Sequence, residues 1–363
     1  MKTKLLYIAP HRPGRSPGQR FRFEQFMTYL QEQGFEITYS YLLNSIDDKI
    51  FYQKGNYLIK LFIGFKGLLI RTRDWLRAGR FDIILVYREA HFIGTTFFEK
   101  RFARSRAKLV FDFDDAIWLN DTSEANSNLS WLKKPEKIGE IIQLSDLVIA
   151  GNKYLADYAR IFTNDVIIIP TSIDTNYHKP QTPDKNNTVC IGWTGSSTTI
   201  KHFQDAVPWL SRLKEKYDDK ITFKVIVDAK MSWPELGIKS TPWTKRTEID
   251  ELNTIDIGIM PLPDDQWSRG KCAFKGLQYM ALEKPAVMSP VGVNNDLILE
   301  NENGFLAANE NEWISKLSAL IDSEGLRIRI GKAGRKTVVD AYSVDVQKVV
   351  FADVLKSLVH LPE

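Results

Sequence analysis

Short apolar runs alternate with amphipathic segments through the first half of the chain. Phe23, Phe26, Met27 and Leu30 recur at the spacing of one helical face, and Gly34 follows as a helix stop. Apolar strands that alternate with helices are typical of a parallel sheet covered on both faces. The pattern therefore predicts an α/β domain, with strands at residues 4–9, 35–42, 81–87, 108–113, 147–150 and 166–169.

The same alternation returns in the second half. A helix is expected at about 198–217, among strands at 189–193, 221–227, 257–260 and 286–288. Residues 171–187 lack periodicity and are rich in Pro, Thr, Asn and Asp, which is typical of a linker. We therefore expect two Rossmann-like, doubly wound domains at 1–170 and 188–342, and an amphipathic C-terminal helix within 343–363.

Composition limits the expected location of the protein. The chain is 44% hydrophobic and 26% charged, as in ordinary globular proteins. Cys190 and Cys272 have neither disulfide nor metal spacing, so we expect reduced thiols. No segment approaches the ~20 apolar residues of a membrane span, and the N-terminus lacks the apolar run of a signal peptide. We expect a cytoplasmic protein that is at most peripheral on the inner face of the membrane.

Positive charge is concentrated in one region. Residues 54–108 hold 13 Lys and Arg and 4 Asp and Glu, a net charge of +9. No nucleic-acid recognition motif accompanies this region, so an anionic membrane surface or an anionic acceptor is favoured over nucleic acid. Within it, residues 57–77 combine a broad apolar surface with regularly placed cations. This segment is either an interfacial helix or a core helix whose lysines reach the surface.

The segment from Lys271 to Ser289 carries the clearest chemical signal. A loop with Lys271 runs into a helix that begins near Lys275, and Pro285 precedes a buried strand. Lysines and backbone N–H groups at a helix start can bind a diphosphate. Lys275 and Gln278 are three residues apart, so both can face one ligand. The alternative is a solvated, lysine-rich helix start.

A glycine-rich turn after strand 189–193 gives a second anion-binding candidate. Gly192, Thr194 and Gly195 stand at this turn, and Lys201 follows. Glycines there would let the backbone approach phosphate oxygens closely. The alternative is a turn that needs glycine only for its dihedral angles.

These segments resemble family 4 glycosyltransferases, whose donor-binding helix has the pattern E-x-M-A-x-G-x-P-V-V-x-S. The matching residues here are Gln278, Met280, Ala281, Pro285, Val287 and Ser289. The chain departs from the pattern in three places. Gln278 replaces the family Glu, Glu283 and Lys284 stand where the family has a Gly before the Pro, and Trp193 occupies the position of a diphosphate-binding Arg.

The resemblance implies a GT-B fold, with the terminal helix crossing back onto the first domain. It also implies sugar transfer with retention of configuration and without a metal or cofactor, the nucleotide-diphosphate sugar being a co-substrate. Lys201 and Lys275 would stabilise the leaving diphosphate, and Gln278 would hold the ribose. Arg269 or Lys271 would take over from the missing Arg.

Three further segments are candidates for the acceptor side. Arg20 and Arg22 follow a loop after the first strand and could clamp a phosphate, or could be a surface pair. Arg88 and His91 follow the third strand, and the family keeps a His in this neighbourhood near the transferred sugar. A structural histidine is the alternative. Asp114 and Asp115 end the fourth strand within Asp112-Phe-Asp114, which in the GT-A fold would hold a divalent cation. We instead expect them to orient acceptor hydroxyls or to brace basic loop residues.

The sequence thus predicts a retaining glycosyltransferase that moves a sugar from a nucleotide donor to a saccharide or lipid-linked saccharide in cell-surface glycan synthesis. Two alternatives stay open. A nucleotide-sugar epimerase would need several carboxylates and histidines as acid and base. A catalytically silent binding subunit would account for Gln278 and Trp193.

Overall fold

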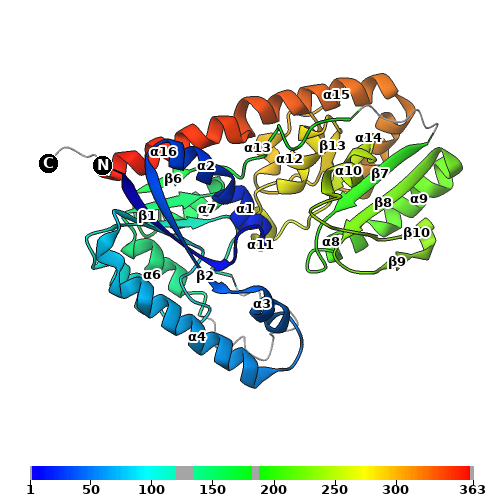
Figure 1. Cartoon of the computed structure of the whole chain (residues 1–363). Coiled ribbons are helices and arrows are strands. Elements are labelled where there is room, and N and C mark those ends of the chain that lie inside the picture. The colour runs from blue at the N-terminus through cyan, green and yellow to red at the C-terminus, as the bar shows by residue number, and fades with distance from the viewer. Residues whose placement is uncertain (1, 120–133, 182–187, 360–363) are drawn as a thin grey trace. The chain divides into compact units, whose positions relative to one another are not determined.

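The structure is a computed structural model that describes residues 2–119, 134–181 and 188–359. The chain divides into two compact units, which we call unit 1 (residues 1–171 and 347–363) and unit 2 (residues 172–346). Residues 182–187 of the predicted linker and 360–363 of the predicted C-terminal segment lie outside the described residues. Helices and strands alternate along the chain in both units (Figure 1).

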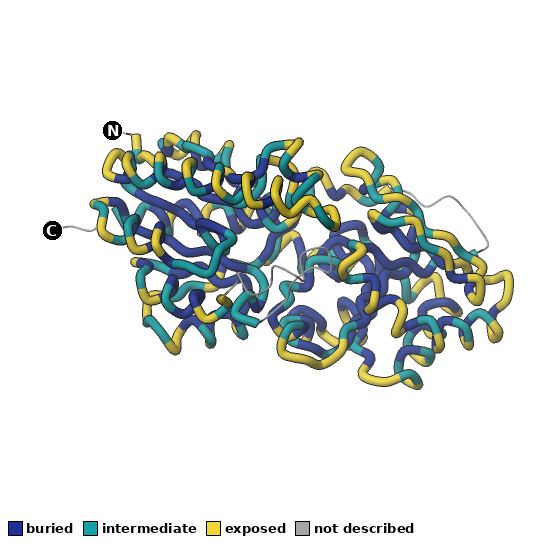
Figure 2. Tube along the Cα trace, turned by 90° about the horizontal axis from the view of Figure 1, so that it is seen from below, coloured by how far each residue is buried: buried dark blue, intermediate teal, exposed yellow. Residues whose placement is uncertain are grey.

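Unit 1 is built on a six-stranded sheet in which every neighbouring pair is parallel, in the order β2-β1-β3-β4-β5-β6. The inner strands are buried on both faces because helices cover both, as the apolar runs predict. In the Cα trace of Figure 2, buried residues run through the interior and exposed residues lie along the outside. The strands are β1 (Thr3–His11), β2 (Phe35–Leu43), β3 (Ile83–Tyr87), β4 (Lys108–Phe113), β5 (Leu147–Ala150) and β6 (Val166–Ile168).

The helices of unit 1 are α1 (Pro17–Arg22), α2 (Met27–Glu32), α3 (Ser45–Phe51), α4 (Tyr57–Leu76), α5 (Phe97–Ala103), α6 (Lys137–Leu144) and α7 (Lys153–Ala159). The helical face predicted around Phe23 is broken into α1, a 3-10 turn η1 (Glu24–Phe26) and α2. The break occurs at Phe23, whose φ is −135°, and whose ring stacks on Tyr7 at 3.8 Å. Packing onto β1 therefore takes precedence over helix continuity.

A buried arginine fixes α4 to the sheet. The Arg71 guanidinium donates to the carbonyl oxygens of Ala9 (3.0 Å) and Ala90 (2.6 Å), and pairs with Asp74 at 3.0 Å. Burial lowers the pKa of Arg71 to about 10, although Asp74 opposes this shift, so the side chain stays charged at neutral pH. One side chain thus joins α4 to β1 and to the segment after β3.

The last helix, α16 (Val344–Val359), begins in unit 2 and ends in unit 1. Its later residues contact the first helices of unit 1. The Phe351 ring lies 5.1 Å from that of Phe26, and Lys356 Nζ donates to Gln33 Oε1 at 2.7 Å. Residues 347–359 therefore complete the core of unit 1 rather than extend unit 2.

Unit 2 contains a second six-stranded sheet with parallel pairs, in the order β11-β8-β7-β12-β13-β14. Its strands are β7 (Val189–Thr194), β8 (Ile221–Val227), β11 (Thr241–Pro242), β12 (Ile257–Met260), β13 (Ala286–Met288) and β14 (Phe305–Leu306). A small hairpin of β9 (Ser232–Trp233) and β10 (Ile238–Lys239) stands apart from it. The short strands β9, β10, β11 and β14 were not predicted, because two residues carry no readable periodicity.

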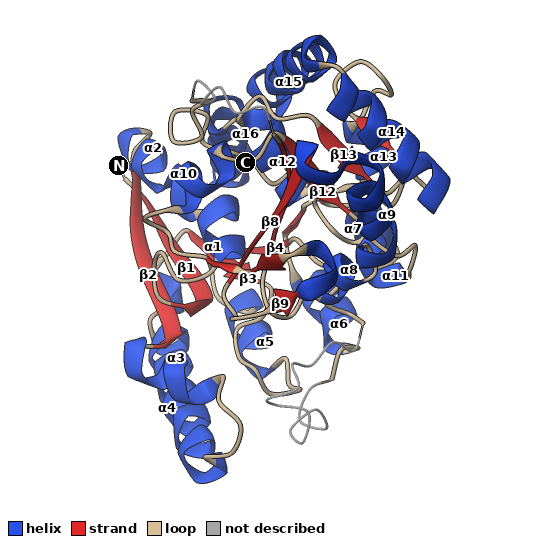
Figure 3. Ribbon diagram, turned by 90° about the vertical axis from the view of Figure 1, so that its right-hand side faces the viewer, coloured by secondary structure: helices blue, strands red, loops and turns tan. Residues whose placement is uncertain are grey.

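The helices of unit 2 lie outside the strand layer (Figure 3). They are α8 (Lys201–Gln204), α9 (Val207–Tyr217), α10 (Glu248–Asn253), α11 (Gln266–Arg269), α12 (Phe274–Ala281), α13 (Asn294–Leu297), α14 (Glu310–Asp322) and α15 (Glu324–Thr337). The single helix expected at 198–217 is two helices, and Pro208 stands in the first turn of the second, where proline is tolerated. The α/β prediction is confirmed in both units.

Each sheet has one point at which the strand order reverses. In unit 1 this lies between β1 and β3, and in unit 2 between β7 and β12. Ligands of open parallel sheets bind at the carboxyl ends of the strands beside such a point. Ligand-binding loops are therefore expected after β1 and β3 in unit 1, and after β7 and β12 in unit 2.

Replacing Arg71 with Met should lower the free energy of unfolding by about 3 kcal/mol, because it strips a buried carboxylate of one partner and leaves two carbonyls unpaired. Urea unfolding followed by circular dichroism measures the change, with hydrogen exchange assigning the transition to unit 1. Arg73 is the matched control, since it contacts the same Asp74 at 3.4 Å but is 61% exposed. Arg73→Met should cost less than about 1 kcal/mol. Equal losses in both variants would contradict the anchoring role of Arg71.

Candidate functional site

A buried tyrosine joins the two segments at the reversal point of unit 2. The Thr194 N–H at the end of β7 donates to the Tyr279 hydroxyl at 2.9 Å. The Tyr279 ring lies against β12, where a Cβ on Gly258 would come within 2.2 Å of it. This bond sets α12, with Lys275 on its first turn, beside the turn that leads from β7 to Lys201.

The glycines of that turn have a role that the sequence did not predict. A Cβ on Gly192 would lie 2.3 Å from Ile255 Cδ1, and a Cβ on Gly195 would lie 2.2 Å from the Trp193 ring. Neither glycine has a positive φ. Both are needed for space against neighbouring side chains, which the sequence did not indicate, and their predicted donor-binding role stays a prediction.

The backbone of the same turn is already engaged within the protein. The N–H groups of Gly195, Ser196 and Ser197 donate to the Ile226 carbonyl (3.0 Å), Thr199 Oγ1 (3.1 Å) and Asp228 Oδ1 (2.7 Å). The Thr194 N–H is used by Tyr279. These four groups cannot also bind a phosphate without breaking those bonds, so an anion here has to be held by side chains.

Three lysines are the side chains that could hold such an anion. Lys275 Nζ lies 5.5 Å from the centroid of the Trp193 ring, and Lys271 Nζ lies 5.1 Å from that of Trp267. Lys201 is exposed at the start of α8, with no ion pair among the described residues. All three act on His202, whose pKa is lowered to about 4 by burial first and then by Lys275, Lys201 and Lys271. The predicted lysines are thus brought together around one buried histidine.

The start of α12 is strained. Ala273, which precedes the helix, has a φ of 53°, in the left-handed region that costs a residue with a Cβ about 1 kcal/mol or more. Its side chain cannot cap the helix, and no side-chain cap is formed. Strain of this kind persists where the surroundings impose it, and such positions gather at binding sites.

Two predicted donor-binding residues are engaged elsewhere. Arg269 forms a two-pronged ion pair with Asp264, with nitrogen to oxygen distances of 2.7 and 3.0 Å, on the surface. Gln278 is only 2% exposed, and its amide nitrogen donates to Glu248 Oε1 at 3.3 Å. The ribose role predicted for Gln278 conflicts with this buried position.

Unit 1 brings together Arg88, Asp114 and Asp115 at the ends of β3 and β4. Arg88 Nε donates to Asp114 Oδ1 at 2.9 Å, and its Nη2 pairs with both carboxylates. Asp114 also accepts from the Tyr87 hydroxyl at 2.8 Å. Arg88 has a φ of 65°, in the left-handed region, so it is a second strained residue after Ala273 and follows the end of β3. The two carboxylates brace a basic residue here, as one of the sequence alternatives had it, and this pairing differs from a metal-binding arrangement.

The structure differs from the roles predicted for Arg22 and His91. Arg22 is buried and pairs with Asp112, and it also donates to the Ile169 carbonyl, so it cannot clamp a phosphate from this position. Arg20, its predicted partner, instead lies with its guanidinium 4.9 Å from the Phe21 ring centroid.

The surroundings of His91 favour the structural alternative. Its Nε2 is 3.1 Å from the Gly64 carbonyl, and its Nδ1 accepts from the Ile93 N–H at 3.3 Å. Burial lowers its pKa to about 4, which keeps the ring neutral. Gly67 on α4 gives it room, because a Cβ there would lie 2.7 Å from His91 Nε2. The ring therefore joins α4 to the segment after β3.

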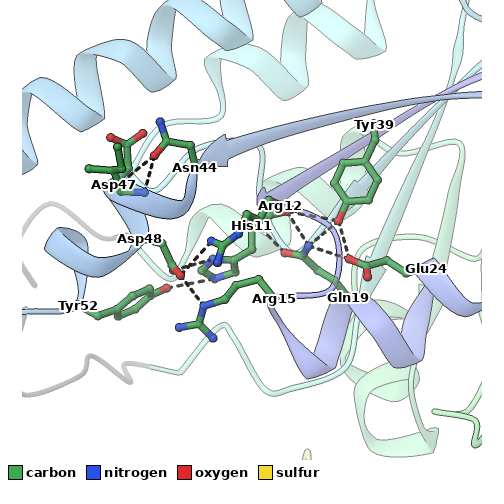
Figure 4. Close-up of polar contacts among 11 residues, drawn as sticks. His11, Arg12, Arg15, Gln19, Glu24, Tyr39, Asn44, Asp47, Asp48 and Tyr52 are labelled. Carbon is green, nitrogen blue, oxygen red and sulfur yellow. Dashed lines mark hydrogen bonds and ion pairs between the residues drawn. The ribbon is translucent and has the colours of Figure 1, made fainter. Parts of the chain in front are cut away.

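The loop after β1 forms a polar cluster that sequence reasoning missed. Asp48 accepts from Arg12 (3.1 Å) and Arg15 (2.5 Å), and its other oxygen lies 3.5 Å from His11 Nδ1 (Figure 4). Burial would raise the pKa of Asp48, but the hydrogen bonds from Arg15 and Arg12 lower it below the usual value. The basic loop at residues 11–15 is visible in the sequence and could have indicated a cluster. Its acidic partner Asp48 could not be identified, because it lies 33 or more residues away in the chain.

Solved structures share this architecture over the whole chain. A glycosyltransferase from Rickettsia africae is 16% identical with a TM-score of 0.69, and the match covers 99% of this chain and 100% of that one. Sucrose-phosphate synthase from Thermosynechococcus elongatus is 11% identical, with a TM-score of 0.69 over 98% and 99% of the two chains. HepE from Anabaena in complex with UDP-glucose is 14% identical, with a TM-score of 0.68 over 98% and 99%.

At these identities the likeness shows the fold alone. Together with the two parallel six-stranded sheets, it identifies the GT-B fold and confirms the predicted fold class. Residues 188–323 match the family model described as glycosyl transferases group 1. Unit 2 therefore carries a group 1 glycosyltransferase domain. No curated protein sequence matched the chain.

Replacing Lys275 with Ala should weaken diphosphate binding by about 1.5 to 3 kcal/mol, or roughly 10- to 150-fold, because it removes a charge-assisted contact. Calorimetry with pyrophosphate and a panel of nucleoside diphosphates measures the change. Lys332 is the control, being an exposed lysine of α15 in the same unit. Lys332→Ala should bind as the wild type does. Unchanged affinity in Lys275→Ala would remove Lys275 from the site.

Proposed function

We propose that this protein is a retaining glycosyltransferase of family 4 that transfers a sugar from a nucleoside-diphosphate donor to a hydroxyl. The observation that carries the proposal is the gathering of Lys201, Lys271 and Lys275 at the reversal point of unit 2. The group 1 domain and the UDP-glucose complex of the Anabaena protein support a nucleotide-sugar donor. Fold alone would not suffice, since one fold hosts many activities.

The lysines fit the chemistry of the leaving group. Negative charge grows on the diphosphate as its bond to the sugar breaks, and fixed positive charges that are already in place stabilise that change. Lys275 and Lys271 are held near aromatic rings, so they need little reorganisation at the moment of transfer. The nucleotide sugar is a co-substrate in this scheme, and no separate cofactor is needed.

We assign the acceptor to unit 1, with Arg88 as the group that contacts it. Its guanidinium is partly exposed and is held by Asp114 and Asp115, which fix its direction. A saccharide or lipid-linked saccharide acceptor offers hydroxyl and phosphate oxygens, both of which accept from a guanidinium. Cell-surface glycan synthesis on the cytoplasmic side of a membrane is the setting that fits such an acceptor.

Incubating the protein with UDP-glucose and other nucleotide sugars, with and without saccharide acceptors, tests the proposal. Transfer should occur with retained configuration and should persist in a chelator, because lysines neutralise the diphosphate. Product analysis distinguishes the alternatives. Epimerised donor without acceptor would indicate an epimerase, and donor binding without any turnover would indicate a silent subunit. Activity lost in chelator and restored by Mg²⁺ or Mn²⁺ would contradict metal-independent transfer.

We further propose that α4 binds an anionic membrane surface. This helix buries Lys60, Arg71 and Asp74 and exposes many apolar residues, which favours the interfacial helix over the core helix. The exposed large hydrophobic side chains of α4 are Tyr57, Leu58, Ile59, Leu61, Phe62, Phe65, Leu69 and Leu76. They lie within the region of net charge +9, and apolar anchors with nearby cations are what an anionic bilayer surface attracts. No helix within the described residues is long and apolar enough to cross a membrane.

A double variant, Phe62→Gln with Phe65→Gln, should lower binding to anionic vesicles by at least about 10-fold, because burying a Phe contributes about 1.5 to 3 kcal/mol. Sedimentation with anionic and neutral vesicles at low and high salt measures this. Both side chains are more than half exposed, so folding should be unaffected. Ile161→Gln is the control, since Ile161 is exposed on another part of unit 1. Equal sedimentation with and without anionic lipid would contradict the proposal, and loss of self-association in the double variant would make the face a dimer contact.

A further inference from the structure

One buried histidine of unit 2 has a ring nitrogen that no hydrogen bond reaches among the described residues. His202 is 4% exposed, on the short helix α8, and its Nδ1 finds no hydrogen-bond partner among the described residues. Leaving a buried donor or acceptor unpaired costs about 1 to 3 kcal/mol. Such a cost is expected where a ligand supplies the missing partner. The sequence did not single out His202.

The charges around His202 come from three segments. Lys201 precedes it on α8, Lys271 lies in the loop before α12, and Lys275 is on the first turn of α12. Asp265, at the start of α11, is the only carboxylate among the leading influences on the ring. The three lysines assigned to the donor diphosphate therefore all act on this ring.

We propose that His202 is a binding residue of the donor site that takes up a proton when the diphosphate binds and then donates a hydrogen bond to it. The inference rests on the proposed function. It goes further by adding a fourth cation to the site, one that exists only in the bound state. Nothing in the resemblance to family 4 assigns a role to this position.

The electrostatics give the direction of the change. In the free protein, burial and three ammonium groups hold the pKa of His202 at about 4, so the ring is neutral at pH 7. A bound diphosphate brings negative charge to the same lysines and replaces repulsion of an imidazolium by attraction. A protonated ring has N–H donors at both nitrogens, so it can donate a hydrogen bond to the diphosphate. If the ligand only restores the pKa to its ordinary 6.5, half of the molecules gain a proton at pH 6.5.

Calorimetry with UDP-glucose at pH 6.5, in buffers of different ionisation enthalpy, tests the proposal. The probe suits the test because its diphosphate diester does not titrate near neutral pH. The wild type should take up about half a proton or more per bound ligand. His202→Gln keeps a neutral hydrogen-bond donor and should take up no proton. The affinity of the wild type for UDP-glucose should rise from pH 8 to pH 6, and that of His202→Gln should not.

The control variant is His11→Gln. The pKa of His11 is also lowered to about 4 by burial, but this histidine belongs to unit 1, so proton uptake should match the wild type. A second variant, His202→Asn, guards against a folding defect of the first, with circular dichroism confirming native structure. Binding with equal proton uptake in wild type and both His202 variants would overturn the inference and leave the transferase proposal standing. Failure of the wild type to bind any nucleotide sugar would overturn both.

Discussion

The hydrogen bond from the Thr194 N–H to the Tyr279 hydroxyl is the contact on which the candidate donor site depends. It joins the end of β7 to α12, and the Tyr279 ring has room only because β12 carries a glycine at position 258. Without this bond, Lys275 on α12 would have no fixed place beside Trp193 and His202. Burial raises the pKa of the Tyr279 hydroxyl, so the acceptor of this hydrogen bond is neutral at physiological pH.

Unit 1 depends on buried ion pairs in a comparable way. Arg71 with Asp74 and Arg22 with Asp112 are fully buried, and each arginine also donates to backbone carbonyls of other segments. A buried pair is weak evidence for stability, since desolvation offsets much of its attraction. What such a pair determines is the position and orientation of the helix that carries it. By burying Arg71 and Asp74, α4 turns its apolar residues outward, which is the feature that suggests a membrane surface.

The sequence predicted what depends on local pattern. Apolar runs located β4, β5, β8, β12 and β13 at the residues observed, because strands buried on both faces appear in the sequence as short continuous apolar runs. The lysines at 201, 271 and 275 were predicted from their positions after strands and at a helix start. The direction of a side chain was not predictable where a distant partner decides it. Arg22 turns inward to Asp112, Gln278 to Glu248, and His91 to Gly64, and none of these partners is near in the chain.

The departure at Trp193 has a physical account. The family pattern has an arginine at this position, whereas here a buried ring packs against Gly195 and lies beneath Lys275. An aromatic face attracts a cation without neutralising its charge, as a carboxylate would. Trp267 has the same relation to Lys271. The site thus exchanges one directly bound cation for two lysines that lie near tryptophan rings, and both lysines act on His202.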